Sequence, residues 1–94
     1  MIITYTNEFS YGLEKLDNSI SIHVIKKIQQ SMIERNFKKL KHLNINILKI
    51  GQYRVGFLDK ENERILLFVG THKEYEEWYS KLTKEKILEI LKDY

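Results

Sequence analysis

The sequence contains no cysteine. This absence excludes disulfide bonds and cysteine-based zinc sites, and it is compatible with a reducing cytoplasm. No apolar run approaches the ~18 residues that a membrane-spanning helix needs. The N-terminal segment MIITYTNEF has no basic region ahead of an apolar one, so neither a signal peptide nor a membrane span is predicted. We therefore expect a cytoplasmic protein without a membrane partner.

Acidic residues are missing from one long interval of the chain. Between Glu34 and Asp59 there is no aspartate or glutamate, although the interval contains six cations: Arg35, Lys38, Lys39, Lys41, Lys49 and Arg54. The formal net charge of +3 understates this asymmetry. A one-sided basic surface attracts polyanions, and nucleic acid is the commonest large one. The alternative is that lysine-rich segments only keep the surface solvated.

The length of 94 residues, with 43% hydrophobic and 31% charged residues, predicts a single globular domain spanning residues 1–94. Apolar residues alternate, or recur at helical spacing, along most of it. The expected order is β-α-α-β-β-β-α-α, with strands near residues 1–6, 44–50, 53–58 and 64–69 and helices near 8–16, 19–36, 72–82 and 84–92. We predict the α+β class: an antiparallel-rich four-stranded sheet with an N-terminal helical hairpin and C-terminal helices.

Local signals predict several details of these elements. Asn7 is the expected cap of the first helix, and Ile22 is expected on the buried stripe of the second. The run from Arg64 to Val69 is apolar on both faces, as in an inner strand. The apolar face of the last helix, from Ile87 to Leu91, either packs on the sheet or is left for a partner.

His72 lies where the hydrophobic period changes from strand to helix. Thr71 and Glu74 have the spacing of a capping box, which predicts a helix with His72 at its first position. The positive end of the helix dipole favours a neutral imidazole and a nearby phosphate, so this histidine could exchange protons near neutral pH. The alternative is a surface histidine without a role. The spacing of His23, His42 and His72 does not predict a metal site.

Two strand cations could serve one phosphate. Arg54 alternates with Tyr53 and Val55 and points to the opposite face, and Lys49 precedes the Gly51 turn. Cations at one end of a sheet could bind a phosphate and stabilise a pentavalent transition state. They could equally be strand cations on an exposed face.

The helix after Thr71 also carries two tyrosines one turn apart, Tyr75 and Tyr79. They could stack on a base or donate to a phosphate. Because Trp78 and Leu82 lie on the same helical face, the alternative is that this stripe is part of the core.

Two motifs carry a resemblance that extends over nearly the whole chain. They are L-K-x-G-x-Y-R-V at Leu48–Val55 and V-G-T-H-K-E-Y at Val69–Tyr75. At these residues the sequence resembles the RelE/ParE superfamily of small toxins from bacterial toxin–antitoxin pairs, and its RelE- and HigB-like members in particular. The resemblance implies a RelE-like fold and a cognate antitoxin as partner.

The resemblance also implies an activity. RelE-type members enter the ribosomal A site and cleave mRNA without a metal or other cofactor, by attack of a ribose 2′-hydroxyl on the adjacent phosphate. Arg54 then matches the residue that binds the scissile phosphate, Lys49 matches the strand cation, and His72 and Tyr75 match the positions for proton transfer and base stacking. We expect RNA contacts from five more side chains: Lys38, Lys39, Lys41, Lys73 and Tyr79.

The resemblance leaves two alternatives to this activity open. ParE-like relatives inhibit DNA gyrase without catalysis, other relatives are inactive, and the fold does not decide between activities. The general base is not identified either. Some related enzymes use a strand carboxylate, whereas the polar positions of this strand hold Asn44 and Asn46.

Overall fold

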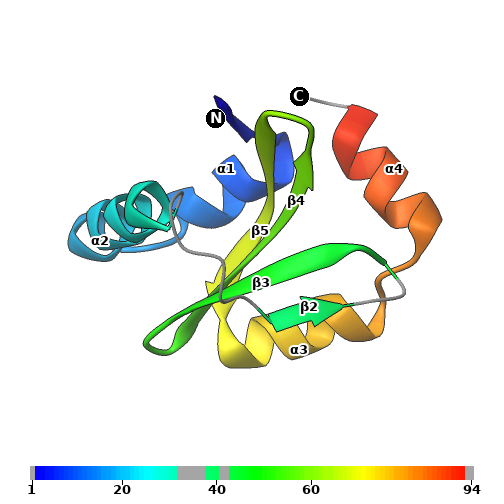
Figure 1. The fold of residues 1–94 in the computed structure, drawn as a ribbon. Helices are drawn as coiled ribbons and strands as arrows, with labels where there is room; N and C mark the ends of the chain where they lie inside the picture. The colour runs from blue at the N-terminus through cyan, green and yellow to red at the C-terminus, as the bar shows by residue number, and fades with distance from the viewer. Residues whose placement is uncertain (1, 32–37, 41–42, 93–94) are drawn as a thin grey trace.

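The computed structural model describes residues 2–31, 38–40 and 43–92. One sheet has the strand order β1-β5-β4-β3-β2 (Figure 1). The strands are β1 (Ile2–Tyr5), β2 (Lys38–Leu40), β3 (Ile45–Ile50), β4 (Tyr53–Lys60) and β5 (Glu63–Thr71). The helices are α1 (Asn7–Glu14), α2 (Asn18–Gln30), α3 (His72–Ser80) and α4 (Lys84–Lys92). The α+β class and the order of the predicted elements are confirmed, with one strand, β2, in addition to the four expected.

The additional strand is short and lies at an edge of the sheet. β2 has three residues and pairs antiparallel with the start of β3, Lys38 opposite Ile47 and Leu40 opposite Ile45. Three residues are too few for an alternating pattern to be recognised in a sequence. Pairing with β3 therefore defines this strand.

The strands β3, β4 and β5 are consecutive antiparallel neighbours, and β1 joins β5 in parallel. As predicted, β5 is an inner strand. Because each strand reverses direction, the β3–β4 turn and the junction between β5 and α3 lie at the same end of the sheet (Figure 1).

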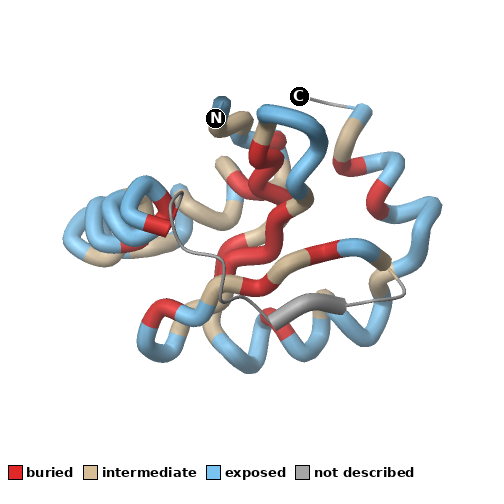
Figure 2. Tube along the Cα trace, in the orientation of Figure 1, coloured by how far each residue is buried: buried red, intermediate tan, exposed pale blue. Residues whose placement is uncertain are grey.

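Each face of the sheet carries its own apolar core. The first core lies under α1 and α2 and consists of Phe9, Val24, Ile28, Ile50, Val55, Phe57, Leu66 and Val69. The second lies under α3 and α4 and consists of Ile45, Ile47, Ile65, Leu67, Tyr75, Ile87 and Ile90. The buried stretches follow the middle of the sheet (Figure 2). The last helix therefore packs on the sheet, although Leu88 on its outer side is 63% exposed.

A β-bulge changes which residues of β5 share a face. Gly56 faces Phe68 and Phe57 faces Leu66, which leaves Leu67 as the extra residue of β5. Leu67 belongs to the second core and Phe68 packs against it, so two consecutive side chains serve one face. Phe68 then stacks on Trp78, with ring centroids 4.7 Å apart.

Two local predictions for the helical hairpin are wrong. The cap of α1 is Thr6 rather than Asn7: Thr6 Oγ1 accepts the Phe9 N–H at 3.2 Å and donates to the Leu66 carbonyl at 2.7 Å. On α2, Ile22 is 64% exposed and Val24 is buried, because an isoleucine-rich helix offers more than one apolar stripe.

The end of α2 also differs from the prediction. The helix ends at Gln30 with Ser31 as its C-cap, and the end expected near residues 35–36 lies outside the described residues. Ser31 is tied to the sheet by Arg64, which is 4% exposed: Arg64 Nη1 donates to the Ser31 carbonyl at 3.2 Å. Arg64 also forms a two-pronged pair with Asp59 at 2.8 and 3.0 Å. This charge network anchors α2 to the β4–β5 hairpin.

Candidate functional site

The two predicted strand cations face each other directly. Lys49 on β3 is the cross-strand partner of Arg54 on β4. Lys49 alternates with Ile45 and Ile47, so this pair projects to the face covered by α3 and α4. Cβ atoms of such partners are about 5 Å apart, and like charges at this distance repel. An anion bound between Lys49 and Arg54 would remove that repulsion.

Arg54 is half-buried and only partly satisfied. Its Nη1 donates to the carbonyls of Gly51 and Tyr53, each at 3.0 Å. Its Nε and Nη2 groups make no hydrogen bond to the described residues. These groups are the donors that a guanidinium presents to a phosphate in fork geometry.

Gly70 keeps the space opposite Arg54 free of a side chain. Gly70 is the partner of Arg54 on β5. A Cβ atom there would meet Phe68 Cζ at 2.8 Å and Glu74 Oε1 at 3.0 Å. A larger residue would therefore require the Phe68 ring and the Glu74 carboxylate to move at this junction of strand and helix.

The start of α3 brings His72 to the same end of the sheet. The predicted capping box is confirmed: Thr71 Oγ1 accepts the Glu74 N–H, and Glu74 Oε1 accepts the Thr71 N–H. The His72 N–H donates to the Gln52 carbonyl in the β3–β4 turn at 2.8 Å. This bond fixes the first residue of α3 to the turn between Lys49 and Arg54.

The His72 side chain is exposed and pairs with Glu76, with 2.6 Å between Nε2 and Oε1. The sequence prediction did not include Glu76, although its i, i+4 spacing from His72 is the signal for such a pair. With Nε2 donating to the carboxylate, Nδ1 is the ring nitrogen left to accept a proton.

Tyr75 lies between these groups and the second core. It is 7% exposed. Its ring centroid lies 6.2 Å from that of His72 and 6.0 Å from that of Tyr79. Burial raises the pKa of the Tyr75 hydroxyl above 10.0; Tyr79 raises it further and the charge of Arg54 opposes this. The hydroxyl is therefore uncharged near neutral pH and can donate a hydrogen bond. Tyr79, 36% exposed, has more ring surface than Tyr75 for stacking on a base.

The other residues predicted to contact RNA or to act as the base lie on several elements. Lys73 is exposed on α3, and Lys38 and Lys39 belong to β2 at the sheet edge. Lys41 lies outside the described residues. Asn46 alternates with Ile47 and so points away from Lys49, which makes it a poor candidate for the general base.

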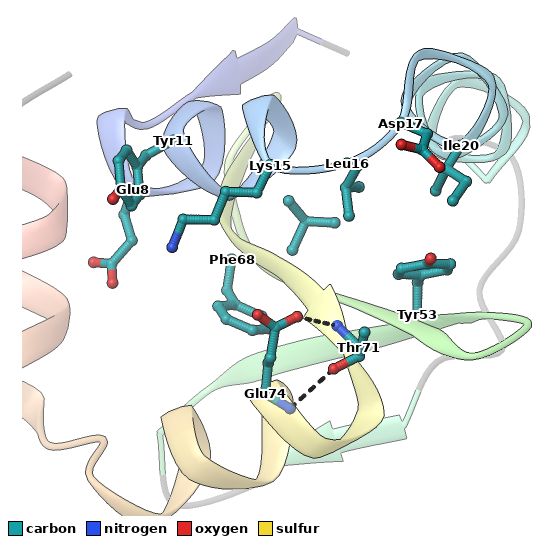
Figure 3. Close-up of a pocket in the computed structure, with 12 residues that line it drawn as sticks. Glu8, Tyr11, Lys15, Leu16, Asp17, Ile20, Tyr53, Phe68, Thr71 and Glu74 are labelled. Atoms are coloured by element: carbon teal, nitrogen blue, oxygen red, sulfur yellow. Dashed lines mark hydrogen bonds between the residues drawn. The ribbon is translucent and has the colours of Figure 1, made fainter.

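A cavity of about 390 Å³ lies at the same end of the sheet, on the face of α1 and α2 (Figure 3). Its lining includes the carboxylates Glu8, Asp17 and Glu74 and one cation, Lys15. The Lys15 ammonium sits 4.3 Å from the centre of the Tyr11 ring. This acidic lining does not suit a polyanion, so the cation pair rather than this cavity is the candidate site.

Within the described ranges, no group of three or more histidine, aspartate or glutamate side chains could hold a metal ion. None of the helices traced there is long and apolar enough to cross a bilayer.

No protein-family model matches the sequence, and no curated protein matches it either. Solved structures do match the fold. A chain of the RelB–RelE antitoxin–toxin complex from Methanococcus jannaschii superposes with a TM-score of 0.67 at 17% identity, over 81% of this chain and 98% of that one. The chain has a RelE-like fold.

Two further structures agree with this RelE-like fold. The toxin–antitoxin complex RelBE2 from Mycobacterium tuberculosis gives a TM-score of 0.64 at 18% identity, over 76% of this chain and 96% of that one. A copper-bound mutant toxin from Helicobacter pylori gives a TM-score of 0.53 at 21% identity, over 79% of this chain and 97% of that one. The fold expected from the two sequence motifs is thus confirmed.

Proposed function

We propose that this protein is the toxin of a toxin–antitoxin pair and acts as a ribosome-dependent mRNA endonuclease that inhibits translation. One observation carries the proposal: the like-charged pair Lys49 and Arg54 lies directly cross-strand at the sheet end where α3 begins. An anion bound between two opposed cations would relieve their repulsion. The scissile phosphate of a message is the anion that the RelE-like fold favours.

The residues at this end can be given roles in phosphodiester cleavage. The ribose 2′-hydroxyl loses its proton and attacks the adjacent phosphorus, the bond to the 5′-oxygen breaks, and that oxygen takes up a proton. Lys49 and Arg54 would stabilise the extra negative charge of the pentavalent phosphate. The products are a 2′,3′-cyclic phosphate and a 5′-hydroxyl end.

Proton transfer is assigned to the start of α3. His72, with Nδ1 left as the acceptor, would take the proton of the 2′-hydroxyl. The uncharged Tyr75 hydroxyl would donate a hydrogen bond to the phosphate or to the leaving oxygen. Tyr79 and Lys73 would hold the neighbouring nucleotide by stacking and by charge, and Lys38, Lys39 and Lys41 would extend the RNA contacts.

The partner proposed for this toxin is a cognate antitoxin. Two of the structures with the same fold are toxin–antitoxin complexes. An antitoxin with acidic side chains could neutralise the toxin by covering Lys49 and Arg54. Ribosome and message are its proposed cytoplasmic targets.

Primer extension on a reporter message during induced expression tests the proposal. Cleavage within codons, lost in an Arg54→Ala variant that is made in equal amount, is the expected result. Intact messages in growth-arrested cells would refute it, and DNA cleavage complexes in those cells would favour a gyrase inhibitor. Normal growth on expression would indicate an inactive relative.

A further inference from the structure

A second cavity lies beside the cation pair, between α2 and the end of β3. It has a volume of about 240 Å³ and is lined by His23, Lys27, Gln30, Leu48, Lys49, Ile50 and Gly51. Three basic residues, His23, Lys27 and Lys49, line it, and no carboxylate does. Three other cavities of the described chain each include at least two carboxylates. This cavity, which we call the α2–β3 pocket, is therefore built for an anion.

The helix α2 places three polar side chains, two of them basic, in one row. His23, Lys27 and Gln30 are spaced i, i+4 and i+7, which puts them on one side of α2. Val24 and Ile28 on the adjacent side are buried in the first core, so the row is held against the sheet. Among the described residues no carboxylate pairs with His23, Lys27 or Lys49. The charge of the pocket is thus left for a ligand.

Lys49 connects the α2–β3 pocket to the cation pair. It lines the α2–β3 pocket and is the cross-strand partner of Arg54. A polyanion bound at Arg54 would therefore continue past Lys49, over the outer edge of β3, to α2.

We propose that the α2–β3 pocket binds a second backbone phosphate of the RNA, next to the phosphate held by Arg54. This inference rests on the proposed function for the identity of the strand. Contacts to the phosphate would be independent of base sequence. They would fix the position of the message relative to His72 and add affinity without taking part in the chemistry.

An NMR titration tests the pocket directly. The probe is a trinucleotide with all its 2′-hydroxyls methylated, which cannot be cleaved by 2′-attack. We expect saturable shifts of the backbone amides of His23, Lys27 and Gly51. Lys27→Ala should weaken binding about tenfold, the effect of one charge-assisted hydrogen bond. The matched control is Lys26→Ala, because Lys26 is an exposed lysine of the same helix outside the pocket lining; its affinity should stay within twofold.

The salt dependence of binding gives a second measurement. Each phosphate contact to a single strand contributes about 0.7 to the slope of log K against log salt. The double variant His23→Ala/Lys27→Ala should lower the slope by about this amount, and Lys26→Ala should leave it unchanged. Equal losses in the Lys26 and Lys27 variants would overturn the inference. So would inorganic phosphate binding as tightly as the trinucleotide, since the pocket would then be a general anion site.

These outcomes are separate from the test of cleavage. If the wild type cuts messages while the Lys26 and Lys27 variants bind RNA equally, the pocket assignment fails and the proposed endonuclease stands. If the trinucleotide occupies the pocket while no message is cut, the phosphate site stands and the endonuclease fails. Thermal melts of both variants check that the fold is unchanged.

Discussion

Removing the charge of Lys49 should make the protein more stable and less active. The variant Lys49→Met keeps the aliphatic stem of the side chain but removes the ammonium group. Lys49 is exposed and forms no ion pair or side-chain hydrogen bond with the described residues, so the change breaks no contact found there. Its charge faces that of Arg54 across the two strands.

The gain in stability and the loss of cleavage rate can both be estimated. Like charges directly opposite cost about 0.2–1 kcal/mol, so relief of the repulsion should raise the free energy of unfolding by about 0.5 kcal/mol. For a domain of this length that corresponds to a rise of about 2–4 °C in Tm. Loss of one donor to the transition-state phosphate should slow cleavage about 100- to 1000-fold.

Thermal melts and single-turnover cleavage on programmed ribosomes measure both quantities. The control is Lys60→Met, an exposed lysine at the far end of β4, which should change neither Tm nor rate. A Tm that falls by several degrees together with the rate would show that Lys49 acts through the fold, and an unchanged rate would remove it from the site. The double variant with Arg54→Met should lose less than the product of the single losses if both cations hold one phosphate.

Three further predictions concern stability and pH. Arg64→Ala should lower the free energy of unfolding in urea by about 3 kcal/mol, because it removes a buried side chain that donates hydrogen bonds to the Ser31 carbonyl and the Asp59 carboxylate; a loss below 1 kcal/mol would contradict this role. Thr71→Ala should cost about 1 kcal/mol through the lost cap, and unchanged helix content and Tm would show that the cap is dispensable. Above pH 10 the unfolded chain loses the Tyr75 proton while the folded chain retains it, since the pKa of Tyr75 is raised in the fold, so wild-type stability should fall with rising pH. Tyr75→Phe should show a smaller fall between pH 9 and 11, and an equal fall in both proteins would contradict the raised pKa.

Features that depend on neighbouring residues could be predicted from the sequence. The capping box at Thr71 needs only residues three apart, and the alternation of Tyr53, Arg54 and Val55 needs only one strand. Antiparallel pairing of consecutive strands then follows from short turns. These signals bring Lys49, Arg54 and His72 to one end of the sheet only if the three strands are consecutive antiparallel neighbours, and it is the structure that shows this strand order.

Features that depend on distant residues could not be predicted. The Ser31 carbonyl that accepts from Arg64 is 33 residues away in sequence, and the parallel partner of β1 is the last strand. On α2 several apolar stripes compete, so burial of Val24 in place of Ile22 is decided by the sheet. The α2–β3 pocket combines a helix and a strand that no local pattern connects. Whether Tyr75 was core or surface was likewise left open by its spacing.

The central claim is that the sheet end with Lys49 and Arg54 cleaves RNA by attack of a 2′-hydroxyl. Purified protein and ribosomes carrying a message with a single 2′-deoxy nucleotide at the cut position test it most directly. We expect cleavage of the all-ribose message to a 2′,3′-cyclic phosphate, and no cut at that position in the deoxy message. Equal cleavage of both messages at the same position would contradict it.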